Sequence, residues 1–496
     1  MMKKIIYLLS LVFIISSCTK LDEEVYDKIP GDMYPETPAQ VSNLSVDAYT
    51  KLKPFADDEG WWFLAQEVSS DEFCAPTRGA DWFDGGKWQN VHRHTWSNDE
   101  ESVNRMWGSM WAGVTTCNQV IDMMSDMAAT PAIEAKKKEV ESLRALYYYF
   151  LIDNYGDVPY ITSAKNAPEM PYKAKRETIY NNLVTTLEQS LPYLKAYDNK
   201  LMFTKYTAYA LLAKLYINSE IYTGVDRYQL AADYCDSLIN GPYNLAANVS
   251  DPFKTENSNS SEIIFAIPYD ENNFTGFRIH MRTLHYQQNL EFDMPVGPWN
   301  GLCIVPDFFD TYEDTDLRKE AYNMWGLRYA VSGSVIIDGE THKPLNIDPH
   351  LPALEMKAAN YTPEEIRMTG ARLGKYEIAM GALENLSNDF PLFRITDFYL
   401  MKAEAEIRAG NNGDNWINQI RTRAGVSAFA GATLDDLLAE RGRELYCEGH
   451  RRQDLIRFGK WEQSWWEKSA HGTDMRVFPI PKWATDVNSN LLLPPQ

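Results

Sequence analysis

The sequence predicts a mostly α-helical protein, built on a tetratricopeptide-like helical repeat scaffold with a large irregular, loop-rich region that carries short strands. Helical patterning runs through residues 101–240 as pairs of helices about as long as tetratricopeptide units. It returns over residues 390–460. Between these parts, over residues 242–388, periodicity is lost and Gly, Pro, Asn and Asp become frequent. We expect a single domain over residues 18–496.

The N-terminus has the pattern of a lipoprotein signal peptide over residues 1–17. Lys3 and Lys4 precede an apolar run from Ile5 to Ile15, which is too short for a membrane-spanning helix of roughly 20 residues. Small residues then lead to Cys18, whose thiol and new amino group would carry acyl chains after cleavage. An ordinary secretory cleavage site is the alternative. The pattern therefore predicts a lipid anchor at Cys18.

Residues 57–100 form the first candidate ligand region. Five Trp residues lie there among Gly, Asp, Arg and Asn, at Trp61, Trp62, Trp82, Trp88 and Trp96. Aromatic faces can stack on the C–H faces of pyranose rings, while amides, carboxylates and guanidinium groups bind the hydroxyls. A helical core would not use this mixture. We therefore expect a loop-rich, sugar-binding surface.

His92 and His94 alternate within this region, in a possible strand. Such a strand would place both imidazoles on one face, as a metal pair requires. No nearby third ligand is compelling, so we predict no metal here.

The next residues follow a helical pattern for more than a hundred positions. In the stretch from Lys205 to Tyr216, alanines recur at spacings that permit close approach between helices. The expected helices pair along the chain as Val103–Met124 with Ala135–Asn154, and Thr178–Leu194 with Thr204–Tyr222, followed by Tyr228–Leu238.

Residues 242–388 form a second candidate ligand region, because long loops inside a compact protein are more often functional than not. Ile263–Pro268 is a plausible strand. Trp299 lies in a Gly-Pro-Trp-Asn-Gly turn that either projects its ring or packs it onto the core. The aromatic-plus-amide chemistry of the first region recurs at Tyr286, Trp299, Asn300 and Trp325.

An acidic cluster in the same region raises the question of calcium. Carboxylates at Asp310, Glu313, Asp314 and Asp316 could supply oxygen ligands, but the glycine of an EF-hand turn is missing. Helix capping explains these carboxylates equally well. We predict no cofactor and keep calcium as the open alternative.

The stretch from Glu440 to Lys460 combines an apolar helical stripe with many charges. Thr433 can cap the helix with Asp436, and Glu440, Glu444 and Glu448 follow at i, i+4 spacing. Arginines that can grip these carboxylates occur at Arg441, Arg443, Arg451, Arg452 and Arg457. Although such a cluster could be an active site, paired Arg and Glu usually fix one helix against another. We therefore predict a structural network.

This stretch, of the form E-R-x-R-E-L-x-x-E-G-x-R-R-x-D-L-I-R-x-G-K, resembles the SusD/RagB family of surface lipoproteins. Residues Phe390–Ala405, Arg144–Pro159 and Phe478–Pro481 support the resemblance, which covers nearly the whole mature chain. It implies a receptor that faces the cell exterior on the outer membrane. Such a receptor captures oligo- or polysaccharide and delivers it to a SusC-like TonB-dependent transporter, without cleaving it.

The resemblance is nearest to the starch-binding branch and also implies ligand contacts. Arg78 and Trp96 match its Arg-containing loop and following aromatic pair, whereas His94 replaces an expected Trp. We expect Trp96, Arg78 and Trp299 to form one solvent-facing platform. The full predicted glycan-binding set is Asp71, Arg78, Trp82, His94, Trp96, Asn98, Asp99, Tyr286, Trp299, Asn300 and Trp325.

Several other classes of protein find no support. The net charge of −21 and the pI of about 4.9 disfavour nucleic acid. Motifs of serine hydrolases, phosphate loops and zinc proteases are absent from the sequence. A receptor for peptides or glycoprotein fragments of the RagB type remains the main alternative. A glycoside hydrolase remains a weaker one, because the acids near the Trp-rich loop follow no catalytic motif.

The cysteines after Cys18 are odd in number and have no short repeated spacing, so we predict no disulfide framework. They are expected to be small buried hydrophobes, and they lie at Cys74, Cys117, Cys235, Cys303 and Cys447.

Overall fold

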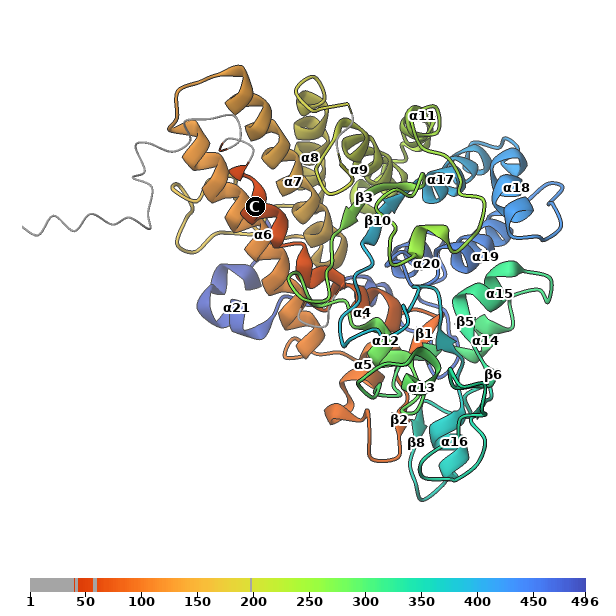
Figure 1. The fold of residues 1–496 in the computed structure, drawn as a ribbon. Coiled ribbons are helices and arrows are strands. Elements are labelled where there is room, and N and C mark those ends of the chain that lie inside the picture. The colour runs from red at the N-terminus through yellow and green to blue at the C-terminus, as the bar shows by residue number, and fades with distance from the viewer. Residues whose placement is uncertain (1–39, 41–42, 57–59, 197–198) are drawn as a thin grey trace, which may run out of the picture. The chain divides into compact units, whose positions relative to one another are not determined.

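The computed structural model describes residues 40, 43–56, 60–196 and 199–496, and its main compact unit runs from Ser45 to Gln496. This unit is mostly helical, as predicted (Figure 1). The expected lipid anchor at Cys18 lies outside the described residues. None of the described helices combines the length and apolar character that crossing a bilayer requires.

Antiparallel helices form the first half of the scaffold. Thr130 accepts a hydrogen bond from the Ile133 backbone N–H and Pro131 follows it, so the start of α7 is well capped. Gly113 of α6 lies against the Tyr147 ring, where a Cβ would approach within 2.2 Å. The helices are α6 (Glu101–Ser125), α7 (Pro131–Tyr155), α8 (Arg176–Ser190), α9 (Lys205–Ile217), α10 (Ser219–Thr223) and α11 (Tyr228–Ile239).

Helices resume after the irregular region and complete the scaffold. The α11 helix packs against α17, which joins the two helical groups, and β3 (Ile263–Ile267) pairs antiparallel with β10 (Phe390–Arg394) beside them (Figure 1). A core cluster that includes Leu400, Ile420 and Leu437 holds the later helices together. These are α17 (Ile395–Arg408), α18 (Asp414–Arg423), α19 (Leu434–Leu445), α20 (Arg451–Arg457) and α21 (Lys482–Val487).

The C-terminal charges form a buried network, as the sequence predicts. Glu440, Glu444 and Glu448 are 0 % exposed. Burial alone would raise the pKa of Glu440, but Arg318 and its neighbours lower this pKa to about 2. Arg394 donates to Glu444 over 3.0 Å and to Glu448 over 2.6 Å. The partners that lie outside the recognised stretch are Arg318, Lys375, Arg394, Arg421 and Arg423.

Strands of two residues each pair the irregular region with the N-terminal segment. β1 (Phe73–Cys74) pairs antiparallel with β4 (Cys303–Ile304), and β2 (Thr77–Arg78) pairs parallel with β8 (Glu355–Met356). The two candidate ligand regions, far apart in sequence, therefore lie side by side. The other strands are β5 (Asn323–Met324) with β9 (Arg372–Leu373), and β6 (Gly326–Leu327) with β7 (Asn346–Ile347).

Short helices also occur within the loop-rich parts of the chain. They are α3 (Val46–Thr50), α12 (Ile279–Thr283), α13 (Asn289–Phe292), α14 (Pro306–Phe309), α15 (Leu317–Tyr322) and α16 (Pro363–Met368).

Residues 57–100 are less loop-like than predicted. They contain α4 (Trp62–Val68), in which every residue is buried, and α5 (Lys87–Arg93). The strand expected around His92 is wrong, because His92 lies on α5 and His94 ends that helix with a left-handed φ of 56°. The high Trp content misled the prediction, since Trp61 and Trp62 are core residues.

Candidate functional site

An open pocket among the predicted aromatic residues is lined by residues of both α5 and α12. It holds about 450 Å³ and receives residues from both candidate ligand regions. We call it the aromatic cleft. Its lining residues are Asp81, Trp82, Asp84, Lys87, Trp88, Arg282, Tyr286, Pro298 and Trp299.

Trp82 joins the two walls of the aromatic cleft, the near wall formed by residues 81–88 and the far wall formed by residues 282–299. Its indole N–H donates to the Trp299 backbone carbonyl over 2.7 Å. Its ring lies against Gly301, where a Cβ would approach within 2.1 Å, so only glycine fits this position. The Trp299 backbone N–H in turn donates to the Met281 carbonyl of α12 over 2.6 Å. These contacts place Trp299 at a fixed position on the far wall.

A row of buried tryptophan rings supports the near wall. Trp88 lies between Trp61 and Trp82, with ring centroids 4.8 and 5.4 Å away. The Trp88 indole N–H donates to Asp84 over 2.8 Å. The Lys87 ammonium lies 5.2 Å from the Trp88 ring and pairs with Glu101 at 2.9 Å. The near wall therefore presents polar groups on a rigid aromatic base.

Tyr286 and Trp299 are the half-buried rings of the cleft. The Tyr286 hydroxyl donates to Asp81 over 2.6 Å, and burial together with Asp81 raises its pKa to about 12. The Arg282 guanidinium lies 5.2 Å from the Trp299 ring centroid. Partly accessible aromatic rings thus stand beside a carboxylate and a guanidinium, the combination that a sugar ring with hydroxyls would use.

Two sequence profiles cover most of the chain. A profile described as the SusD family matches residues 261–491, and one described as starch-binding and associating with the outer membrane matches residues 23–217. The chain belongs to the SusD/RagB family.

Individual SusD-like proteins show how far the similarity extends. The starch-binding protein SusD of Bacteroides thetaiotaomicron is 25 % identical over 468 residues, spanning 80 % of this chain and 78 % of SusD. A SusD superfamily structure from Parabacteroides distasonis has a TM-score of 0.75 at 19 % identity, covering 94 % of this chain and 99 % of that chain. Surface glycan-binding protein A from B. thetaiotaomicron, in complex with laminarihexaose, has a TM-score of 0.72 at 21 % identity, covering 90 % and 97 %. The structural matches show that the helical fold is shared.

Arg78, which the SusD/RagB resemblance assigns to the ligand, does not line the aromatic cleft and is only 3 % exposed. Its guanidinium donates to the backbone carbonyls of Ile366 over 2.8 Å and Thr369 over 3.1 Å. Its donors are thus used to hold irregular backbone. The structure therefore differs from the expectation that Arg78 faces solvent hydroxyls.

Trp96 is also buried, at 6 % exposure, so the expectation of a solvent-facing ring is wrong. Its ring contacts Phe478 at 4.5 Å and His94 at 4.9 Å. His94 stacks on Trp461 at 4.0 Å, and burial lowers its pKa well below the usual value. The cause is the C-terminal segment, which covers these rings and for which the sequence pattern predicted no such role.

The remaining predicted residues are scattered. Asp71 pairs with Arg451 at 2.7 Å and lines a separate pocket of about 280 Å³. Asn300 is fully buried and accepts from Arg372 over 2.7 Å. Trp325 lines another pocket of about 360 Å³. Asn98 and Asp99 are exposed but do not line the aromatic cleft.

Of the predicted set, the structure therefore brings together Trp82, Tyr286 and Trp299. The cleft adds Lys87 and Arg282, which the sequence pattern did not single out, and uses Asp81, Asp84 and Trp88 from the Trp-rich stretch. The recurrence of Trp beside Asp at positions 81–88 was the available signal. Nothing in the local sequence marks Arg282.

The carboxylates of the acidic cluster that we considered for calcium form ion pairs with separate basic side chains. Asp316 pairs with Arg318 at 2.8 Å, and Asp314 pairs with Lys319 at 2.7 Å. Glu313 contacts Arg421 at 3.1 Å. Within the described part of the chain, no group of three or more His, Cys, Asp and Glu side chains is arranged to hold a metal ion. Asp310, the fourth acid of the cluster, lies 2.9 Å from the His350 imidazole.

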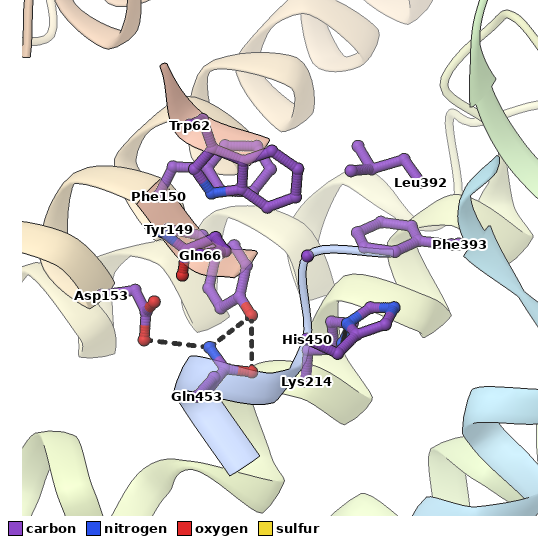
Figure 2. A pocket seen from close by; sticks show the side chains of 11 residues that line it. Trp62, Gln66, Tyr149, Phe150, Asp153, Lys214, Leu392, Phe393, His450 and Gln453 are labelled. Carbon is purple, nitrogen blue, oxygen red and sulfur yellow. Dashed lines mark hydrogen bonds between the residues drawn. The ribbon is translucent and has the colours of Figure 1, made fainter. Parts of the chain in front are cut away.

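Figure 2 shows an enclosed pocket inside the scaffold, between α4, α7 and the start of α20. The Gln453 amide, which donates to Tyr149 over 2.8 Å and to Asp153 over 2.9 Å, crosses its floor (Figure 2). The space is about 20 Å³, which suits a single water rather than a sugar. This pocket is therefore part of the packed scaffold.

Proposed function

We propose that the protein is a cell-surface glycan-binding lipoprotein and that the aromatic cleft holds the oligo- or polysaccharide. The observation that carries the proposal is the pairing of half-buried Tyr286 and Trp299 with Asp81 and Arg282 around about 450 Å³. A pyranose offers C–H faces for the rings and hydroxyls for the polar groups. The names of the relatives, a starch-binding protein and a glycan-binding protein in complex with laminarihexaose, support the same class of ligand.

Capture rather than cleavage is the second part of the proposal. The acids of the cleft already accept hydrogen bonds from its own rings: Asp81 from the Tyr286 hydroxyl, and Asp84 from the Trp88 indole. Glycosidases instead need one carboxylic acid that protonates the leaving oxygen and a second carboxylate for the nucleophile or the water. The cleft carboxylates are better suited to positioning hydroxyls.

Surface attachment and delivery form the third part. The signal-peptide pattern before Cys18 and the profile match that mentions the outer membrane support a lipid anchor there. The bound glycan would then pass to a SusC-like TonB-dependent transporter. Replacing Cys18→Ala should release the protein from the membrane fraction. Continued membrane association of that variant, with an unacylated wild type, would contradict the anchor.

A polysaccharide panel tests ligand binding and cleavage together. We expect retarded migration of the purified protein in native gels that contain at least one glycan, and no released oligosaccharide after long incubation. Tyr286→Ala should abolish the retardation. Tyr329→Ala, which removes a Tyr that is 50 % exposed and outside the cleft, is the matched control and should migrate as wild type. Binding only to peptides would favour a RagB-type receptor, and released sugar would favour a hydrolase.

A further inference from the structure

Two cysteines that are 229 positions apart in sequence face each other in the structure. Cys74 of β1 and Cys303 of β4 are directly opposed partners in an antiparallel pair. Both side chains are 0 % exposed, and both are free thiols. Opposed residues in antiparallel strands have Cα atoms about 4.5 to 5.5 Å apart, within the range of about 4.4 to 6.8 Å that a disulfide spans. The backbone is therefore already in place for a covalent link.

The two thiols also contact each other. The Cys74 thiol hydrogen-bonds to the Cys303 sulfur. Gly370, with a φ of +82°, packs against Cys303, where a Cβ would lie 2.6 Å from its sulfur. A residue with a Cβ at position 370 would therefore displace the Cys303 sulfur. The other thiols, at Cys117, Cys235 and Cys447, have no cysteine opposite them in a strand pair.

Two buried arginines give Cys303 an electropositive setting. Arg78 donates to the Cys303 sulfur over 3.6 Å, and its other partners are backbone carbonyls. Arg372 is buried nearby, and its Nε and Nη1 have no hydrogen-bond partner. Burial alone would raise the pKa of Cys303, but the Cys74 hydrogen bond and these two guanidinium groups lower it below its ordinary value. The positive charge of the two arginines therefore favours the thiolate form of Cys303, which is the form that attacks disulfides.

We propose that Cys74 and Cys303 form a disulfide by exchange with an external low-molecular-weight disulfide. The Cys303 thiolate attacks one sulfur of that oxidant, which releases one thiolate and leaves a mixed disulfide on Cys303. Cys74 loses its proton and attacks the Cys303 sulfur, which releases the second thiolate. The oxidant gains two electrons and, after protonation, leaves as two thiols, so that one S–S bond replaces two S–H bonds. Since both sulfurs are fully buried in the folded protein, the exchange takes place late in folding, after β1 has paired with β4 and before the surrounding chain covers the two cysteines.

The link would join the two chain segments that lead to the walls of the aromatic cleft. Trp82 follows Cys74 along the chain by way of β2, and Trp299 lies four positions before Cys303. Joining β1 to β4 therefore fixes the two chain segments that carry the opposite walls. An oxidising location outside the cell would favour the bond. This consequence rests on the proposed function, whereas the chemical test below needs no ligand.

Peptide mapping without reduction tests the link. The full chain carrying Cys18→Ala is unfolded, reduced and refolded with a mixture of reduced and oxidised glutathione, and free thiols are then alkylated in denaturant. We expect one cross-linked peptide that joins Cys74 to Cys303, with Cys117, Cys235 and Cys447 alkylated. Cys303→Ser should lose that peptide and leave Cys74 alkylated or carrying glutathione, while Cys117→Ser should keep the link.

The same map contains the result that would overturn the proposal. If Cys74 and Cys303 are both fully alkylated after refolding to the native circular dichroism spectrum, the pair does not form a disulfide under oxidising conditions. A cross-link from either cysteine to Cys117, Cys235 or Cys447 would also contradict it. Because the Cys18→Ala chain, which keeps Cys74 and Cys303, gives these readings, failure of the Cys303→Ser variant to fold leaves the test intact.

Discussion

The C-terminal charge network and the aromatic cleft use the same residue types in opposite ways. In the network, Glu444 is 0 % exposed and receives donors from several arginines that lie far apart in sequence. In the cleft, Asp81 and Asp84 are exposed and each accepts a hydrogen bond from a neighbouring ring. Arginine, acid and aromatic residues together therefore mark either a scaffold or a site. Their burial, which requires the fold, decides between the two.

The tryptophans repeat this contrast. Trp96 is covered by Phe478 and the C-terminal segment, whereas Trp299 stands half-buried on the wall of an open pocket. Both were expected to serve one ligand platform. Their separation means that mutations should divide into those that lower stability and those that lower affinity.

The largest expected effect lies in the charge network. Arg394→Ala would leave Glu262, Glu444 and Glu448 without their shared guanidinium. Stranding buried carboxylates costs about 3 to 5 kcal/mol, so the free energy of unfolding in urea should fall by that order. Arg93→Ala is the control, because the Arg93–Glu355 pair is partly exposed, at 32 % and 27 %, and its loss should change stability by less than about 1 kcal/mol. Equal effects of the two substitutions would remove the contrast between buried and exposed charges.

Trp96→Ala should act on stability rather than on binding. Emptying a packed aromatic site costs about 3 to 5 kcal/mol, and the neighbours of Trp96 are other core rings. We expect a clearly lowered melting temperature and, below it, unchanged affinity for the glycan. A variant with wild-type melting but lost binding would place Trp96 in the site after all.

Acid should weaken the scaffold through its buried histidines. Burial lowers the pKa of His280, His285 and His450 to about 4, from an ordinary value of 6.5. Between these two pH values the unfolded chain therefore binds more protons than the folded protein. The free energy of unfolding thus decreases as the pH decreases, by about 1.4 kcal/mol per pH unit for each histidine. Urea titrations at pH 7, 5.5 and 4.5 measure this slope, which His450→Gln should reduce. A free energy of unfolding that stays constant over this range would contradict the prediction.

The sequence predicted the helices well and the site only in part. The α17 helix lies within residues 390–460, where helical patterning was expected to return, because a 3.6-residue apolar period marks a helix locally. The cleft depends instead on pairs such as Trp82 with Trp299, which meet only through short strands formed by distant residues. The Cys74–Cys303 pairing stayed hidden for the same reason. No local pattern shows that Phe478 covers Trp96 or that Arg78 lies below a loop.

The most direct test of the account is a calorimetric titration of wild type, Trp299→Ala and Trp483→Ala with the best glycan from the panel. Trp483 is 50 % exposed and lies outside the cleft, so it controls for loss of a surface indole. By analogy with bases stacked on aromatic side chains, loss of the Trp299 ring should cost about 1 to 3 kcal/mol of binding free energy. That corresponds to roughly ten- to hundredfold weaker binding, with melting unchanged. Unchanged affinity in a well-folded Trp299→Ala would contradict the assignment of the aromatic cleft as the glycan site.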